Sequence, residues 1–208
     1  TYAVRDDDMP KVHLGIGFET TGWNSEKHYP LMVLQMMLGN ANSSRAHTDQ
    51  YASSDLVANT ATWQLADSIT PFNTIYSDTG IFGLYAVANC NQLDILATDM
   101  IRGLIHHSTH VPEQSLIEAR NKLKLSLASQ YEGTEATCQE LGRQLLSHNR
   151  RITLEESYMR IDNVDQMAVQ NIVKDFFVDQ DFIMSAVGNT WELQDYALLR
   201  KKAYLPWF

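Results

Sequence analysis

Cysteine and long apolar runs are scarce in this sequence. The 208 residues contain two cysteines, Cys90 and Cys138, and neither belongs to a Cys-x-x-Cys pair or to a zinc-ribbon spacing. We expect both to be buried thiols in a reducing compartment. The longest uninterrupted apolar stretches are only a few residues long, far short of the roughly 18 to 20 residues that span a bilayer. The sequence therefore predicts that the chain itself does not cross a membrane.

Positive charge is also in short supply. Lys and Arg number 16 against 25 Asp and Glu, which gives a formal net charge of -9. Nucleic-acid binding depends on Lys and Arg to neutralise phosphates, so this balance argues against a nucleic-acid partner. An acidic surface suits simple solubility, and it also suits a binding face for cationic peptides. Composition leaves both readings open.

An apolar signal core and an initial Met are missing as well. The sequence opens with Thr-Tyr-Ala-Val-Arg-Asp-Asp-Asp, so we expect any targeting sequence to have been removed or to belong to an upstream part. Hydrophobic residues make up 44% of the chain and charged residues 20%, the proportions of an ordinary globular domain. We predict a single domain over residues 1–208, built around one core.

Hydrophobic periodicity predicts strands and helices in the first half of the chain. Apolar residues alternate with polar ones or glycine from Val12 to Phe18, which is the period of a strand with one buried face. Asp78 and Gly80 favour a turn between two later strands, with Gly80 at a positive φ, and Pro71 marks an edge or a bulge. In order, we predict a strand over 11–20, a helix over 25–39, a loop over 40–54, a helix over 54–64 and a hairpin of strands 66–77 and 80–89.

The second half of the chain is predicted to be mainly helical. Leu93, Leu96, Met100 and Leu104 belong to the most regular apolar stripe in the sequence. The predicted elements are a helix on this stripe, helices over 112–131 and from Gly133 to Asn149, a helix capped by Thr153 and Glu156, a helix from Asp165 to Val178, a strand over 182–188, and a final helix from Asn189 and Glu192 to Lys201 and Lys202. This order predicts an α+β fold with helices packed on an antiparallel or mixed sheet.

Histidines invite a search for a metal site. His106 and His110 are one helical turn apart beside His107, but Pro112 places them at a helix end, where histidine also meets the helix dipole favourably. His-x-x-Glu-His and His-Glu-x-x-His pairings are missing, and no carboxylate stands at ligand spacing from two histidines on one helix. We predict no metal ligand in this chain.

Other catalytic signatures are missing too. A Gly-x-Ser-x-Gly elbow, a P-loop and a Gly-x-Gly-x-x-Gly loop do not occur. Gly15 and Gly17 lie inside a strand pattern, and Glu155 with Glu156 stands at a predicted helix start, where the dipole favours acidic residues. We therefore predict no catalytic and no cofactor-binding residue, and we expect no activity from this chain alone.

A series of short motifs resembles one known family along essentially the whole chain. It resembles the second domain of beta-type subunits among the insulinase-type zinc peptidases, a group that includes the mitochondrial processing peptidase and the Core 1 subunit of respiratory Complex III. The motifs, in order, are Arg5-Asp6-Asp7, Met9-Pro10, Gly22-Trp23, Phe72-Asn73-Thr74, Tyr76-Ser77-Asp78-Thr79-Gly80, Gly83-Leu84-Tyr85, Ala119-Arg120-Asn121-Lys122-Leu123-Lys124, Leu141-Gly142-Arg143-Gln144, Asn149-Arg150-Arg151-Ile152, Arg160-Ile161-Asp162 and Ala186-Val187-Gly188.

The resemblance implies a fold, a location and partners. Each subunit of this family consists of two similar α+β domains, and the zinc motif belongs to the first domain, so zinc is expected in a preceding domain or a partner. The implied partners are a homologous N-terminal domain, an alpha-type or Core 2 subunit and other Complex III subunits. The implied location is the matrix side of the mitochondrial inner membrane.

Two departures from the family pattern bear on activity. Some relatives carry an Arg and a Tyr just ahead of the hairpin that contact substrate, and counting back from the hairpin places Thr60 and Asp67 at these positions. Thr60 has no positive charge, and an ionised Asp67 only accepts hydrogen bonds. The loop at 40–54 also lacks the short glycine run usual before Ser53-Ser54-Asp55-Leu56, which removes conformational freedom and favours a structural subunit.

Three functions remain open. The first is a structural domain of the Complex III core, with presequence processing possible in the whole assembly. The second is the non-catalytic half of a soluble matrix processing peptidase, and the third is a scaffold that binds peptides without catalysis. The aromatic segment Tyr204–Phe208 further predicts contact with a partner surface, or with the domain's own core.

Overall fold

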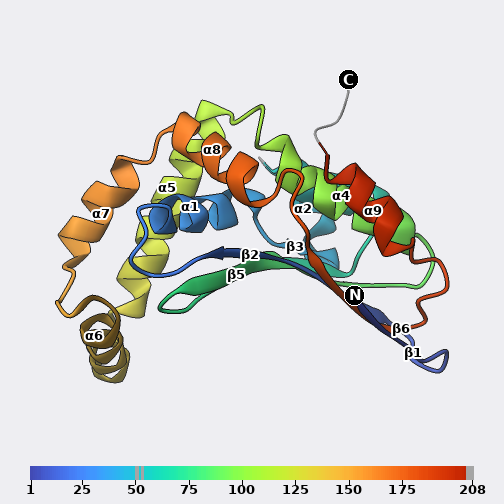
Figure 1. Cartoon of the computed structure of the whole chain (residues 1–208), viewed down its shortest axis with the longest axis horizontal. Helices are drawn as coiled ribbons and strands as arrows, with labels where there is room; N and C mark the ends of the chain where they lie inside the picture. Colours follow the sequence, from blue (N-terminus) through green and yellow to red (C-terminus); the bar gives the residue numbers. More distant parts are fainter. Residues whose placement is uncertain (50–51, 53, 205–208) are drawn as a thin grey trace.

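The protein has two layers, a six-stranded sheet and a set of helices that cover one of its faces (Figure 1). The computed structural model describes residues 1–49, 52 and 54–204. Within this part the strand order is β1-β6-β2-β5-β4-β3. The strands are β1 (Tyr2–Arg5), β2 (Val12–Thr21), β3 (Ala41–Asn42), β4 (Ser68–Ile75), β5 (Thr79–Ala88) and β6 (Ile183–Gly188).

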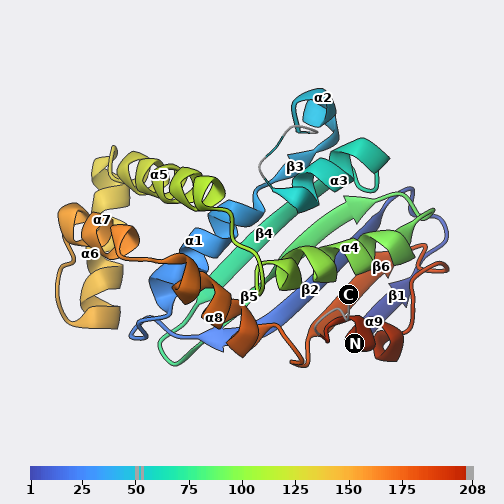
Figure 2. The ribbon, with the colours of Figure 1, turned by 90° about the horizontal axis from the view of Figure 1, so that it is seen from above.

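The helices gather on one side of the sheet, and α5, α6 and α7 extend beyond one end of it (Figure 2). None of the described helices is both long and apolar enough to cross a membrane. The helices are α1 (His28–Leu38), α2 (Ala46–Asp49), α3 (Asp55–Trp63), α4 (Leu93–His106), α5 (Glu113–Gln130), α6 (Thr134–His148), α7 (Leu154–Asp162), α8 (Gln166–Phe176) and α9 (Tyr196–Lys202), with a 3-10 turn at Ser43–Arg45.

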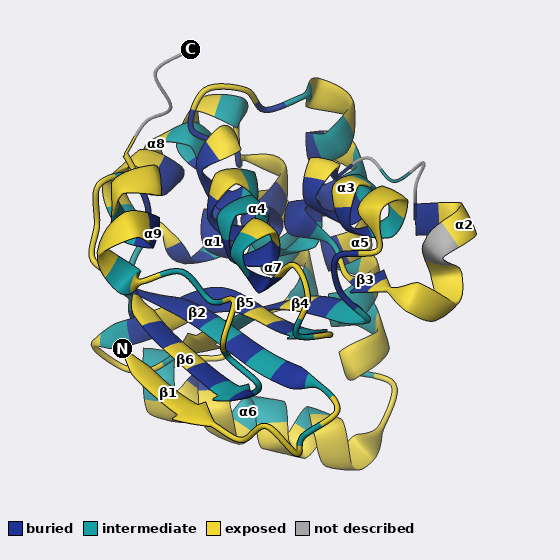
Figure 3. Ribbon diagram, turned by 90° about the vertical axis from the view of Figure 1, so that its right-hand side faces the viewer, coloured by how far each residue is buried: buried dark blue, intermediate teal, exposed yellow. Residues whose placement is uncertain are grey.

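The core lies between the two layers, where Figure 3 shows the buried positions on the sheet beneath the helices. The alternation in β2 points Leu14, Ile16 and Phe18 inward, and each is at most 1% exposed. The ring of Phe177 contacts two others: its centroid lies 5.1 Å from that of Phe18 and 5.2 Å from that of Phe82. The stripe of α4 is buried, as predicted. The helices packed on the sheet confirm the predicted α+β fold class.

The sheet is antiparallel except at one edge. β2 pairs with β5 and β6, and β4 pairs with β5, all antiparallel. β1 runs parallel to β6 and was missed from the sequence, because its four residues are all exposed and show no alternation. Pro71 in β4 lies beyond the two-residue pairing with β3, so the predicted edge position is confirmed.

The structure corrects two local predictions. Gly80 is not at a positive φ; it is a residue of β5, and a Cβ there would lie 2.7 Å from the carbonyl oxygen of Thr21. The last helix begins at Tyr196, because Asn189 and Glu192 bond elsewhere: the Asn189 side chain accepts from Trp191 N, and the Glu192 side chain accepts from Gln92 N. Neither contact caps a helix at 189.

The prediction that both cysteines are buried is wrong. Cys138 is exposed on α6 and Cys90 is half-buried. Cys138 is exposed because α6 buries little of its surface, with Gln144 as its one buried residue. The predicted contact of the C-terminal segment concerns residues 204–208, of which Tyr204 is 55% exposed and 205–208 lie outside the described residues.

Candidate functional site

The positions of the family's substrate-contacting pair, Thr60 and Asp67, lie on one cavity of about 270 Å³. Thr60 is 2% exposed, and its hydroxyl donates to Leu56 O at 2.7 Å within α3. Asp67 pairs with Lys11 at 2.7 Å. Because the hydroxyl is committed to its own helix and the carboxylate to a lysine, neither Thr60 nor Asp67 offers a donor for a developing oxyanion.

The side chains of the three histidines at the end of α4 do not converge on one point. The rings of His106 and His110 are 6.0 Å apart, and His106 approaches Asp55 at 3.5 Å. His107 turns away from them, is 8% exposed, and places Nδ1 2.9 Å from Gly103 O. Within residues 1–49, 52 and 54–204, no three His, Cys, Asp or Glu side chains gather as a metal would require.

A larger concave site lies where the segment after β2 meets α1, α6 and α7. We call it the arginine hollow and define it by Trp23, His28, His148, Arg150, Ile152 and Arg160; its volume is about 860 Å³. A second hollow of about 430 Å³ shares Trp23, His28, His148 and Ile152 with it and continues toward Arg143 and Tyr131. Residues far apart in sequence thus form one continuous depression.

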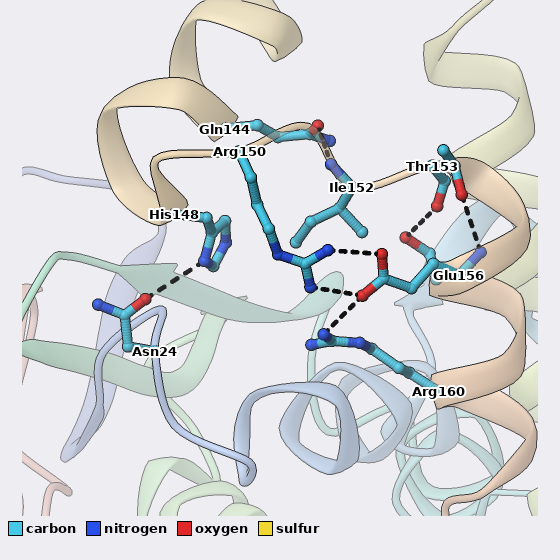
Figure 4. Close-up of polar contacts among 9 residues, drawn as sticks. Asn24, Gln144, His148, Arg150, Ile152, Thr153, Glu156 and Arg160 are labelled. Atoms are coloured by element: carbon cyan, nitrogen blue, oxygen red, sulfur yellow. Dashed lines mark hydrogen bonds and ion pairs between the residues drawn. The ribbon is translucent and has the colours of Figure 1, made fainter.

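Two arginines of the arginine hollow share a single carboxylate, as Figure 4 shows. Arg150 donates two hydrogen bonds to Glu156, at 2.9 and 2.6 Å, and Arg160 donates to the same carboxylate at 2.6 Å. These hydrogen bonds, that from Arg150 first, hold the pKa of Glu156 below its ordinary value. The shared carboxylate fixes both guanidinium groups beside each other at the start of α7.

Local capping explains why the site forms here. The Thr153 hydroxyl accepts from Glu156 N at 3.3 Å, which confirms the predicted cap of α7. The side-chain oxygen of Gln144 accepts from Ile152 N at 2.9 Å and so fixes the segment between α6 and α7. From the sequence, Glu155 and Glu156 are interpreted only as acidic residues that the helix dipole favours. In the structure, Glu156 of this pair also positions two arginines.

Trp23 is the aromatic centre of this region. Arg143 lies over its ring at 4.6 Å, and the rings of His28 and His148 lie 5.0 and 6.0 Å from it. Arg160 in turn lies 5.5 Å over the ring of Tyr29. Such cation–π contacts hold guanidinium groups against an apolar wall without consuming all of their N–H donors.

His28 is the buried polar group of the site. It is 7% exposed, and its Nδ1 has no hydrogen-bond partner in the described part of the chain. Burial, followed by the charges of His148, Arg143 and Arg160, lowers the pKa of His28 to about 4. Burial and the arginines Arg160, Arg150 and Arg143 also lower the pKa of His148, which indicates a positive potential in the hollow.

The arrangement is suited to binding and lacks the groups for covalent catalysis. Arginine side chains, imidazoles and an indole can hold an acceptor-rich ligand, but among the named residues no Ser, Cys or Lys nucleophile stands beside a base. Sequence analysis missed this site, because Trp23 and Arg150 are distant in sequence. Several of the family motifs, Gly22-Trp23, Leu141-Gly142-Arg143-Gln144, Asn149-Arg150-Arg151-Ile152 and Arg160-Ile161-Asp162, contain its residues, but nothing in the sequence joined them.

Comparison with known proteins identifies the family. Residues 1–123 match the family described as "Peptidase M16 inactive domain". The probable mitochondrial-processing peptidase subunit beta of Arabidopsis thaliana is 37% identical over 199 residues, which cover 96% of this chain and 37% of that protein. The human mitochondrial-processing peptidase subunit beta is 33% identical over 197 residues, which cover 95% of this chain and 40% of that protein.

A solved structure shares the fold. A chain of "Complex III2 from Candida albicans, Inz-5 bound" superposes with a TM-score of 0.91 at 24% identity, over 97% of this chain and 48% of that chain. The present chain spans about two fifths of the length of the curated relatives it matches. The family that the sequence motifs predicted is thus confirmed, and the chain belongs to the peptidase M16 family, in which it corresponds to the domain described as inactive.

Proposed function

We propose that this chain is the non-catalytic C-terminal domain of a beta-type subunit of the processing peptidase and Core 1 group, and that it is a structural part of the matrix-side core of Complex III in mitochondria. The observation that supports this most directly is the cavity at Thr60 and Asp67. The Thr60 hydroxyl is bonded within α3 and Asp67 is paired with Lys11. Neither group supplies the positive charge that stabilises an oxyanion.

The proposed partners follow from the same reading. A homologous N-terminal domain, an alpha-type or Core 2 subunit and other Complex III subunits would surround this domain. The fold shared with a chain of the Candida albicans Complex III structure supports such an assembly, and the mitochondrial relatives support the location. Any zinc would be held outside this chain, in the N-terminal domain or in a partner.

A second candidate is half of a soluble matrix processing peptidase. The similarity to processing-peptidase beta subunits from plants and animals favours it, and its substrates would be basic presequence peptides. In that case this domain would contribute structure, and catalysis would depend on zinc bound elsewhere in the assembly.

Native electrophoresis of detergent-solubilised mitochondria tests the proposal. The protein, detected by an epitope tag, should co-migrate with the cytochromes of Complex III. Recovery in the soluble fraction with an alpha-type subunit would instead support the second candidate. Recovery in neither would favour a scaffold that binds peptides.

A metal analysis tests the non-catalytic role separately. The purified 208-residue chain should bind no stoichiometric zinc and should cleave no presequence peptide. One tightly bound zinc per chain that is lost in His106→Ala would contradict this expectation, because it would place a metal site at the end of α4.

A further inference from the structure

The arginine hollow has hydrogen-bond donors that the described part of the chain leaves free. Arg150 and Arg160 direct Nη groups at Glu156, and their Nε atoms have no acceptor among the described residues. These donors belong to residues that line the same hollow.

The charges around the hollow favour an acceptor with negative charge. Two guanidinium groups face one shared carboxylate, that of Glu156. Lys27 and Asp175, which also line the hollow, neutralise each other at 2.7 Å. Glu26, the other lining carboxylate, is exposed to solvent. An incoming carboxylate would therefore complete the charge balance of the arginine pair.

The rest of the surface requires an occupant with apolar groups. Trp23 and Ile152 form part of the wall of the hollow. On the far side of Trp23, a further hollow of about 520 Å³ is lined by Trp23, Arg143 and Leu146. Leu146 is 88% exposed and lines this further hollow, so α6 presents an apolar side chain next to the charged site. Tryptophan and arginine beside apolar contacts form the composition of a protein-binding hot spot.

We propose that the arginine hollow docks a carboxylate-bearing segment of a partner polypeptide. One acidic side chain contacts Arg150 and Arg160, and a neighbouring apolar side chain packs against Trp23 and Leu146. A free inorganic anion would leave Trp23 and Leu146 uncovered. The inference rests on these side chains and stands independently of the proposed function.

The unpartnered His28 supports the same conclusion. Its buried Nδ1 lies in the wall shared by both hollows and lacks a partner within the described residues. Burial first, and then the charges of His148, Arg143 and Arg160, disfavour the protonated form of His28, so an acidic group that enters the hollow and offsets these charges should ease its protonation. Binding is thus expected to be tighter at pH 5 than at pH 7, in a range where Glu and Asp side chains remain largely ionised.

A labelled peptide tests the proposal on the full chain. The probe is a fluorescein-labelled peptide of alternating Glu and Leu, followed by fluorescence anisotropy at low salt, with the matching Gln/Leu peptide as the uncharged comparison. The double variant Arg150→Gln/Arg160→Gln should bind the Glu/Leu peptide at least about tenfold more weakly than the unchanged protein. The matched control is Arg5→Gln, because Arg5 also pairs with a carboxylate and its side chain is 52% exposed, as is that of Arg150.

The outcomes separate this occupant from others. Equal binding by the double variant and by Arg5→Gln would overturn the proposal, as would equal binding of the Glu and Gln peptides. Arginine-dependent binding to vesicles of phosphatidylglycerol without peptide binding would assign the hollow to a membrane instead. A dimer in sedimentation that dissociates in the double variant would assign it to a second copy. If the double variant loses its helical circular dichroism, Arg150→Gln alone carries the test, since that side chain is half exposed.

Discussion

Gly83 lies where two neighbouring strands and an aromatic ring come together on the uncovered face of the sheet. A Cβ at this position would collide with the carbonyl oxygen of Ile16 and would lie 2.7 Å from the ring of Phe72. We expect Gly83→Ala to lower the free energy of unfolding by roughly 2–4 kcal/mol, because backbone atoms of β2 would have to move. Urea denaturation followed by circular dichroism measures this loss.

The control is another glycine, Gly142 on α6. No atom outside its own helix turn lies within 4 Å of a Cβ built there. Gly142→Ala should stabilise the protein by about 0.5–1 kcal/mol through helix propensity. Equal effects of the two substitutions would show that the close approach at Gly83 is not a constraint.

His28 gives the stability of the fold a defined pH dependence. Its pKa is about 4 in the folded chain against an ordinary value of 6.5. Below pH 6.5 the unfolded chain takes up a proton that the folded chain resists, so this contribution to stability is complete above pH 6.5 and falls as the pH drops toward 4. The total is on the order of 3 kcal/mol.

The substitution His28→Gln removes this titration. Between pH 7 and pH 4.5 the unchanged protein should lose about 2–3 kcal/mol more unfolding free energy than His28→Gln, measured by urea denaturation at each pH. The quantity compared is the slope of unfolding free energy against pH. This slope reports the titration of His28, whereas loss of its contact with Trp23 shifts the free energy at every pH. Parallel curves for the two proteins would show that His28 is accessible to protons in the folded chain.

Helix boundaries show which elements can be read from the sequence. The cap at Thr153 correctly predicted the start of α7, and the apolar stripe of α4 predicted that helix without a cap. The start of α9 could not be predicted, because the Glu192 side chain accepts from Gln92 N, a residue that precedes α4. Cap-like spacing at Asn189 is a local pattern, and a contact with a distant loop overrides it.

The caps of α7 and α8 provide a test at the level of the element. Thr153 accepts a hydrogen bond from Glu156 N, whereas the Asp165 side chain makes no such bond to α8. We expect Thr153→Ala to cost about 1 kcal/mol of unfolding free energy, and Asp165→Ala about half as much through the helix dipole alone. Chemical denaturation of both variants measures the difference, and a larger loss in Asp165→Ala would reverse the assignment.

At the scale of the whole molecule, the sequence predicted the fold class and the family but not the arginine hollow. Hydrophobic periodicity and turn or cap residues are local signals. Together with several co-linear motifs they specify an α+β domain. The hollow brings together Trp23, which follows β2, Arg150, which precedes α7, and Arg160, which lies in the last turn of α7. Their proximity depends on how α6 and α7 extend beyond the sheet (Figure 2), a geometry that no short pattern encodes.

The place of β6 in the sheet bears on how the chain folds while it is being made. β6 lies between β1 and β2, although residues 183–188 are synthesised long after both of those strands. Until they emerge from the ribosome, β1 has no partner strand and β2 keeps one edge open. Open strand edges invite pairing with other chains, and pairings across such long sequence separations form slowly. We therefore expect the open edges of β1 and β2 to need protection by chaperones until residues 183–188 are available, and the sheet to close late.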